Sequence, residues 1–409
     1  METHYQKLNC GICGSPNIDQ VLDLGSMPLA NAFVHEEDLL SPELSFPLAV
    51  NFCNNCSALQ LSHVVNGEIL FKNYHYETSA SRPLVEHLQA LADEIVKKHT
   101  ESPDDLVVEI GSNDGTLLSR IKDRSRVLGV DPAENIAKIA SKNGVPTIVD
   151  FFTRKVAKRI KLEMGEARVI VANNVMAHMD DIRSVFSAVK ELLSPKGKFI
   201  FEVHWVGNLI TKGGFDQIYH EHVYYHSLNA LKFLTDSLGL VITDVALVPI
   251  HGESLRVYVG REGASSQAVS NFLNREIEMG LIKKETYLTF SKKIESNKNK
   301  LLQLLDGLKK DGKKIFGYGA SAKGNTLLNY FKIGPKVLDY ITDTTKAKQG
   351  TYTPGARIPV VSPEILKNEL PDYMFLLSWN YADVILEKEK DLREKGVKFI
   401  IAVPEVRIV

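Results

Sequence analysis

The sequence has almost no net charge, no long apolar run and little cysteine, and each of these absences excludes a class of protein. Its 409 residues carry a formal net charge of −1, so no basic field favours nucleic acid or an anionic membrane. No apolar run is long enough to cross a bilayer, and residues 1–4 do not begin the basic-then-apolar pattern of a signal peptide. We therefore expect a cytoplasmic protein that binds neither nucleic acid nor membrane.

The four cysteines all lie before residue 57, in two Cys-x-x-Cys pairs: Cys10 with Cys13, and Cys53 with Cys56. In a reducing compartment this clustering favours a metal over disulfides. Two such pairs form a closed tetrahedral site of four thiolates, for which zinc fits best, and a closed site is structural. The alternative is four reduced cysteines without metal, but both pairs have ligand spacing and no cysteine is left over.

From residue 106 onward, apolar runs alternate with helical segments, a pattern typical of a doubly wound parallel sheet. We expect strands at 106–110, 126–130, 145–149, 167–172 and 197–203, and helices at 83–98 and 181–193. Ligands bind at the carboxyl ends of such strands. The side chains that should converge there are Glu109, Asp131, Asp150, Asn173 and His178, together with the segment 204–226.

The first of these strands runs into a turn that carries Gly111 and Gly115, just before a helix. Glycine lets the backbone approach a ligand closely, and the amino end of a helix favours anionic groups. The spacing is neither the Gly-x-Gly-x-x-Gly dinucleotide fingerprint nor a P-loop. Asp131 follows the second strand, where an acid can bind ribose hydroxyls.

Residues 213–226 hold three histidines, three tyrosines and two acids in one short segment. The segment does not alternate as a strand would, and imidazoles transfer protons near neutral pH. The alternative is a polar loop whose aromatic side chains pack on a domain. Upstream, Tyr74 and Tyr76 share a face of an extended stretch that is either part of the site or a connector.

A second strand, Gly-rich turn and helix occupy residues 313–326 and indicate a smaller Rossmann-like unit at the C-terminal end. The turn either cradles a phosphate, with Lys323 as the counter-charge, or belongs to a scaffold without a ligand. A nicotinamide cofactor is a further possibility, weakly supported by Asp343 near the end of a later strand-like run.

The segment Val-Val-Glu-Ile-Gly-Ser-Asn-Asp-Gly at 107–115, with an acid after the second strand, resembles the class I S-adenosylmethionine-dependent methyltransferases. Together with the four cysteines, residues 173–178, 218–222 and 251–256, the chain resembles the sugar C-methyltransferases over essentially its whole length. These enzymes act on nucleotide-linked 4-keto-deoxysugars of the mycarose and tetronitrose type. One departure is Glu253, which stands where a second glycine is expected after His251 and Gly252.

The resemblance implies an α/β fold in three parts. These are a zinc-binding module at 1–75, an S-adenosylmethionine-binding domain at 76–262, and a helical connector with a smaller Rossmann-like domain at 263–409. It also implies that His222 removes the C3 proton and that His178 donates toward the C4 oxygen. Tyr219 and Glu221 would orient the base or hold the sugar, and Tyr74 or Tyr76 would close over it. The cofactor would be bound by Glu109, Gly111, Ser112, Asn113, Gly115, Asp131, Asp150, Phe151 and Asn173.

Other readings of the sequence stay open. The protein could methylate oxygen or nitrogen of another small molecule, bind zinc and nucleotide without catalysis, or reduce a keto sugar with a nicotinamide cofactor. The methyltransferase interpretation is preferred because it explains the first glycine turn, Asp131 and the histidine-rich segment together. We expect a monomer.

Overall fold

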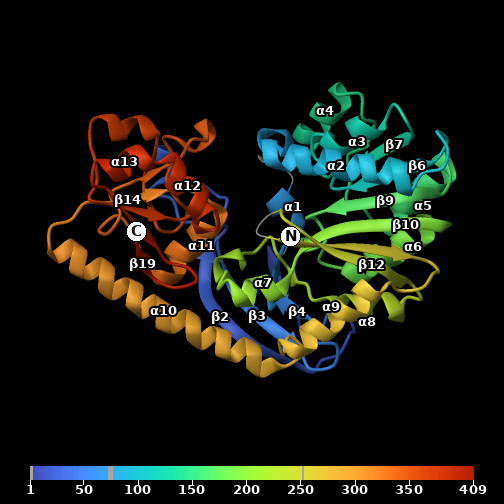
Figure 1. The fold of residues 1–409 in the computed structure, drawn as a ribbon, viewed down its shortest axis with the longest axis horizontal. Coiled ribbons are helices and arrows are strands. Elements are labelled where there is room, and N and C mark those ends of the chain that lie inside the picture. Colours follow the sequence, from blue (N-terminus) through green and yellow to red (C-terminus); the bar gives the residue numbers. More distant parts are fainter. Residues whose placement is uncertain (1–2, 72–76, 251–252) are drawn as a thin grey trace.

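The computed structural model describes residues 3–71, 77–250 and 253–409 (Figure 1). A middle domain and a C-terminal domain form two lobes, and the strands of the N-terminal module lie between and beneath them. The α/β class and the three-part architecture expected from the sequence are confirmed.

The middle domain is a mainly parallel sheet covered by helices on both faces. Its described strands run in the order β12-β13-β10-β9-β6-β7-β8, and β13 pairs antiparallel with both β10 and β12. Every residue of β6 is buried, which is why apolar residues fill this strand at every position except Glu109. The strands are β6 (Leu106–Ile110), β7 (Arg126–Val130), β8 (Thr147–Ile148), β9 (Ala167–Asn173), β10 (Leu193–His204), β12 (Val241–Val248) and β13 (Ser254–Gly260).

The helices of this domain bury one apolar stripe each. In α2 the buried residues Leu84, Leu88, Leu91 and Ile95 recur at helical spacing. The helices are α2 (Arg82–Lys98), α3 (Thr116–Ile121), α4 (Glu134–Lys142), α5 (Arg154–Met164), α6 (Ile182–Leu192), α7 (Val206–Thr211) and α8 (Leu228–Ser237), with 3-10 turns η2 (Thr78–Ala80) and η3 (Phe215–Gln217).

The N-terminal module shares a sheet with the histidine-rich segment. The strand order is β11-β4-β3-β2, and β11 (Tyr224–Tyr225) comes from that segment. This pairing fixes the segment against the module. The remaining elements are β1 (His4–Gln6), β2 (Ile18–Pro28), η1 (Glu36–Asp38), β3 (Ser45–Cys53), β4 (Leu59–Leu61), β5 (His63–Val65) and α1 (Gly67–Phe71).

The C-terminal domain has a smaller sheet of order β16-β15-β14-β17-β18-β19, parallel except for β19. Two helices, α9 (Gln267–Glu278) and the long α10 (Lys284–Lys310), connect it to the middle domain, and α10 runs beneath both lobes (Figure 1). Its elements are β14 (Ile315–Tyr318), α11 (Ala322–Phe331), β15 (Ile341–Thr342), η4 (Lys346–Lys348), β16 (Val360–Val361), η5 (Pro363–Lys367), β17 (Tyr373–Leu376), η6 (Trp379–Tyr381), α12 (Ala382–Lys388), α13 (Lys390–Glu394), β18 (Lys398–Ile401) and β19 (Arg407–Ile408).

Within the three described ranges, none of the helices combines the length and the apolar character that crossing a membrane requires.

Candidate active site and metal centre

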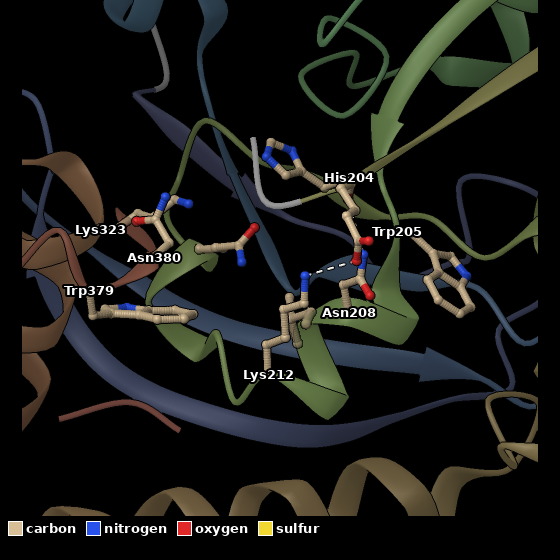
Figure 2. Close-up of a pocket in the computed structure, with 10 residues that line it drawn as sticks. His204, Trp205, Asn208, Lys212, Lys323, Trp379 and Asn380 are labelled. Atoms are coloured by element: carbon tan, nitrogen blue, oxygen red, sulfur yellow. Dashed lines mark hydrogen bonds and ion pairs between the residues drawn. The ribbon is translucent and has the colours of Figure 1, made fainter. Parts of the chain in front are cut away.

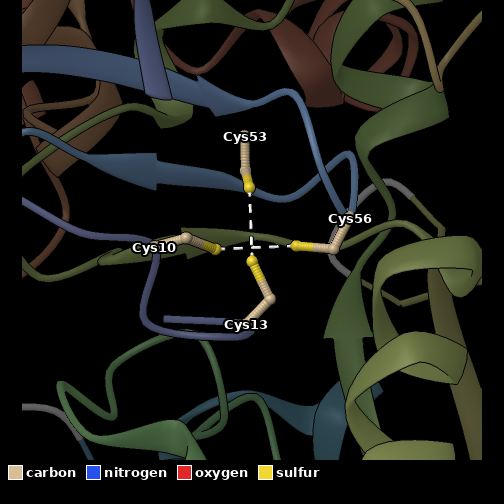
Figure 3. Close-up of side chains that lie close together, drawn as sticks. All are labelled: Cys10, Cys13, Cys53 and Cys56. Carbon is tan, nitrogen blue, oxygen red and sulfur yellow. Dashed lines mark hydrogen bonds between the residues drawn. The ribbon is translucent and has the colours of Figure 1, made fainter. Parts of the chain in front are cut away.

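The four cysteine side chains point toward one centre (Figure 3). Their sulfur atoms all lie within 4.8 Å of one another, and the Cys10–Cys56 and Cys13–Cys53 sulfur pairs are 3.5 Å apart. A tetrahedron with zinc–sulfur bonds of about 2.3 Å has edges of about 3.8 Å, so this set fits zinc. All four ligand positions are taken by protein, so the centre is structural.

The turn after β6 has the backbone of a ligand-binding loop. Gly111 has φ +67°, and a Cβ there would lie 2.7 Å from a methyl carbon of Val175. Gly111 therefore packs against Val175, in the loop that follows β9. Val175 lies three positions before His178 in the sequence. Asn113 and Asp114 accept hydrogen bonds from the backbone N–H groups of Thr78 and Ser79, at 2.9 and 2.8 Å. The turn is thus held from both sides.

Buried polar atoms without a partner among the described residues gather beside this turn: Glu109 Oε2, Ser112 Oγ and Asn173 Oδ1. Burial raises the pKa of Glu109 well above its usual value, while a hydrogen bond from Asn173 at 3.4 Å opposes the shift. Glu109 and Asn173 end adjacent strands β6 and β9. Because buried polar atoms are rarely left unpaired, these fit a ligand that brings donors, as the amino end of S-adenosylmethionine does.

Asp131 directly follows β7, as expected. Its two carboxylate oxygens accept the backbone N–H groups of Asn113 and Ala133, both at 2.9 Å, and each oxygen keeps a second lone pair. Asp150 is exposed and accepts the N–H of Phe151, whose ring lies against Gly67 at the start of α1. The expected cofactor residues therefore line one edge of the sheet from β9 to the end of β8.

Three histidine rings gather at the same edge. His222 lies 5.1 Å from His178 and 5.5 Å from His204, measured between ring centroids, and the Tyr219 ring is 4.1 Å away. His222 Nδ1 donates to the Gln217 carbonyl at 2.8 Å. That bond places the proton of the neutral ring on Nδ1, so Nε2 is the basic nitrogen. Burial lowers the pKa of His178 to about 4, so it is neutral at pH 7.

The other two polar residues of the motif turn toward the N-terminal module. His220 is 2% exposed and donates from Nε2 to the Phe46 carbonyl at 3.1 Å, which makes it a structural residue. Glu221 is 6% exposed and accepts a hydrogen bond from the Asn31 side chain at 2.6 Å. Burial raises the pKa of Glu221 to about 7, and the Asn31 amide opposes that shift.

A pocket lies between the middle and C-terminal domains, next to the histidine cluster (Figure 2). Two residues that contact His222, namely His204 and Gln217, also line it. Its other lining residues are Trp205, Asn208, Leu209, Lys212, Glu253, Lys323, Trp379 and Asn380.

The charged groups of the cavity are held by contacts within and between the domains. Lys212 Nζ lies 2.8 Å from Glu253 Oε2. Trp379 donates from its indole N–H to the buried carboxylate of Asp216 at 2.6 Å, across the domain boundary. Burial raises the pKa of Asp216 to about 6, and burial lowers the pKa of Lys323, the nearby lysine at the start of α11.

Sequence reasoning predicted His178, Tyr219 and His222, and the structure brings these three together. It did not single out His204 or Asn31. His204 had one usable signal, since it directly follows a predicted strand whose carboxyl end faces the site. Tyr74 and Tyr76 lie outside the described residues, as do His251 and Gly252.

Comparison with known proteins matches three family models in succession. The model described as a zinc binding domain covers residues 10–71, the methyltransferase domain covers 80–245, and the C-methyltransferase C-terminal domain covers 249–404. The C-methyltransferase NovU of Streptomyces niveus is 38% identical over 404 residues, which are 98% of this chain and 96% of that protein.

Solved structures align with less of the chain. Magnesium protoporphyrin IX methyltransferase (ChlM) from Synechocystis PCC 6803, with bound SAM, has a TM-score of 0.34 and 14% identity, covering 48% of this chain and 89% of its own. The YcgJ protein from Bacillus subtilis has a TM-score of 0.35 and 14% identity, covering 44% of this chain and 100% of its own.

Proposed function

The chain belongs to the C-methyltransferase family, and from that premise we propose that it methylates C3 of a nucleotide-linked 4-keto-deoxysugar. The observation that carries the proposal is the position of His222, between His178 and His204 and with Nδ1 bonded to a carbonyl. Methylation of a carbon next to a ketone requires loss of a proton from that carbon, and a neutral imidazole suits this task near pH 7.

In the proposed reaction, His222 Nε2 takes the C3 proton and the electron pair of the C–H bond spreads onto the C4 oxygen. His178 donates a hydrogen bond to that oxygen, and its low pKa keeps it a neutral donor. S-adenosylmethionine supplies an electrophilic methyl group on a sulfonium. Tyr219, whose ring centroid lies 4.1 Å from that of His222, keeps the base in one orientation. C3 would bond to the methyl carbon as the bond between that carbon and sulfur breaks, and the electron pair of the broken bond would stay on sulfur as a neutral thioether.

The residues that would hold the cofactor's amino acid end are Glu109 and Asn173, since Glu109 Oε2 and Asn173 Oδ1 are buried and lack partners in the described part of the chain. Gly111 joins that region to the histidine cluster, because it packs on Val175 in the loop that carries His178. The donor and the base would therefore lie at one edge of the sheet.

The acceptor would extend from this cluster into the cavity between the domains. Lys212 and Lys323 line the cavity, and two ammonium groups suit the diphosphate of a sugar nucleotide. Asn208 and Asn380 add amide groups for its hydroxyls and base. The lining thus offers ammonium groups for a diphosphate and amides for hydroxyls, which supports a nucleotide-linked sugar as the acceptor.

Mass spectrometry of reactions with S-adenosylmethionine and a panel of TDP-, GDP- and CDP-4-keto-6-deoxysugars tests the proposal. We expect one member of the panel to gain a single methyl group at C3. In deuterated water without the methyl donor, the wild-type protein should exchange the C3 hydrogen of the same sugar.

His222→Asn should slow both methylation and this exchange by about 10² to 10⁴-fold, the usual contribution of a general base. His220→Asn is the matched control, because it changes the histidine two residues earlier whose ring bonds the Phe46 carbonyl. It should lower stability and keep the exchange rate of the folded protein. Unchanged exchange in His222→Asn would mean that another residue is the base.

A further inference from the structure

The carboxyl group of Glu221 is held by a residue from a different domain. Asn31 Nδ2 donates to Glu221 Oε1 at 2.6 Å, although the two residues are 190 positions apart. Glu221 is 6% exposed, whereas Asn31 is an exposed residue. The Asn31 side chain is therefore held by this hydrogen bond and not by burial.

The loop that carries Asn31 is fixed on both sides of it. It follows β2 of the zinc-binding module. Ala30 accepts a hydrogen bond at 2.7 Å from the side chain of Asn325, a fully buried residue of α11. Val34 and Tyr352 exchange backbone hydrogen bonds of 2.9 and 2.8 Å. The C-terminal domain thus sets the position of a module residue that reaches the middle domain, and all three parts of the chain meet at Glu221.

The hydrogen bond from Asn31 affects the protonation of Glu221, because few other groups interact with this carboxyl group in the described part of the chain. Its neighbours in the motif turn to backbone carbonyls, His220 to Phe46 and His222 to Gln217. In the described part of the chain, Asn31 is the one group that lowers the pKa of Glu221, against burial, which raises it to about 7. A hydrogen bond donated to a carboxylate favours its ionised form. The amide therefore influences both the direction and the charge of this carboxylate.

We propose that Asn31 is a positioning residue of the active site: its amide fixes the carboxylate of Glu221, the residue that directly precedes the base in the sequence, so the zinc-binding module takes part in catalysis. This inference rests on the proposed function, because Glu221 adjoins His222. The module is then more than a stabilising appendage. Its loop supplies the amide that holds Glu221, whereas the zinc ligands lie at the other end of β2 and β3, where Ile18 pairs with Cys53.

The test measures kcat against pH for Asn31→Ala and Asn31→Asp. Loss of the amide donor should move the acid limb of the profile up by about one pH unit, so kcat near pH 7 falls about fivefold and recovers above pH 8. The KM for S-adenosylmethionine and the zinc content should not change. Asn31→Gln keeps an amide and should restore part of the rate. Gln20→Ala, which removes an exposed amide–carboxylate contact of the same module, should leave the profile unchanged.

A double-mutant cycle separates positioning from a general loss of structure. In a Glu221→Gln background, Asn31→Ala should cause no further shift of the pH profile. A uniform fall of kcat at every pH, or an equal shift in both backgrounds, overturns the inference. The two hypotheses fail separately: an inactive wild-type protein contradicts the proposed function. An active wild-type protein with an unchanged profile in Asn31→Ala contradicts only the role of Asn31.

Discussion

At the scale of single residues, the backbone carbonyl that each histidine meets decides its role. His220 and His222 lie two positions apart in one motif. His220 bonds the Phe46 carbonyl through Nε2, whereas His222 bonds the Gln217 carbonyl through Nδ1. The first ring is thereby fixed to the zinc-binding module, and the second presents Nε2 as its basic nitrogen to the site. The resemblance already singled out His222 as the base, and the fold shows the contacts that distinguish the two rings.

The raised pKa of Glu221 predicts an effect of acid on stability. Its folded pKa is about 7, above the value of 4.5 that an unfolded chain has. The folded protein therefore binds the proton first, and the wild-type protein gains stability, up to about 3 kcal/mol, as pH falls from 7 to 4.5. Glu221→Gln lacks that gain. Thermal unfolding should show its Tm falling further below the wild-type Tm between pH 7 and pH 5.

The buried histidines do not disturb this comparison. His178, His220 and His226 have pKa values lowered to about 4 by burial, so both proteins lose stability in the same way as pH falls below 6.5. Glu191→Gln is the control, because Arg154 lowers the pKa of that exposed carboxyl. Its Tm difference from wild type should stay constant over the window. A constant difference for Glu221→Gln as well would contradict a raised pKa.

Residues whose type and spacing identify a role, such as metal-binding cysteines, could be predicted from the sequence. Residues whose role depends on a contact with a distant segment could not. The spacing of the four cysteines is itself the signal of a metal site. Cys10, Cys13, Cys53 and Cys56 could therefore be predicted as zinc ligands from the sequence alone. An asparagine in a loop is ordinary, and nothing in the sequence links Asn31 to Glu221. That link depends on how two loops 190 residues apart are packed.

At the scale of elements, Glu253 departs from the expected glycine, and its backbone shows why a glycine suits the position. Its φ is +78°, in the left-handed region that glycine favours. A residue with a Cβ is strained there by about 1 kcal/mol. In return, the Glu253 carboxylate forms an ion pair with Lys212 at the cavity, but both side chains are nearly half exposed, so the pair contributes at most about 1 kcal/mol.

Two substitutions at this position separate the backbone strain from the contribution of the ion pair. Both Glu253→Ala and Glu253→Gly remove the ion pair, but only Gly relieves the backbone. Glu253→Gly should be more stable than Glu253→Ala by about 1 kcal/mol in urea unfolding. Glu166 is the matched control, since its ion pair with Lys161 is 2.9 Å long and similarly exposed, and its φ is not positive. There Ala should be more stable than Gly. The same order at both positions would show that the Glu253 backbone is not strained.

Elements with a strong local pattern were predicted well. The buried run of β6 and the helical spacing of α2 depend on neighbouring residues, so both could be placed from the sequence. Arg256, part of the motif at 251–256, shows the limit. Its guanidinium bonds the fully buried Glu202 at 2.8 Å and Glu94 at 3.0 Å, so it ties β13 to β10 and α2. Arg256 therefore has a structural role, which the sequence could not predict because its partners Glu202 and Glu94 are distant in sequence.

At the scale of the whole molecule, the site exists only where the three parts meet. The middle domain supplies His178, His204 and His222. The C-terminal domain supplies Lys323 and Trp379 to the cavity. The module supplies Asn31 and the sheet that β11 extends. The sequence predicts each unit from its own periodicity, but it holds no local signal for their relative placement. The cavity between the domains could therefore not be predicted.

Zinc removal tests whether this assembly matters for the reaction. Zinc holds β3 and the loop before β2 together through Cys53 and Cys10, and structural zinc contributes about 10 kcal/mol or more to folding in small zinc modules.

A strong chelator should release one zinc per chain and make residues 10–65 sensitive to protease. One face of the middle sheet has a core without module residues, whereas the core on the other face is continuous with the module. S-adenosylmethionine binding measured by calorimetry should therefore weaken less than methyl transfer does. Methyl transfer should be lost, because the partner strands of β11 are then no longer held in place, and added zinc should restore it. Full activity after complete zinc release would mean that the module only accompanies the enzyme.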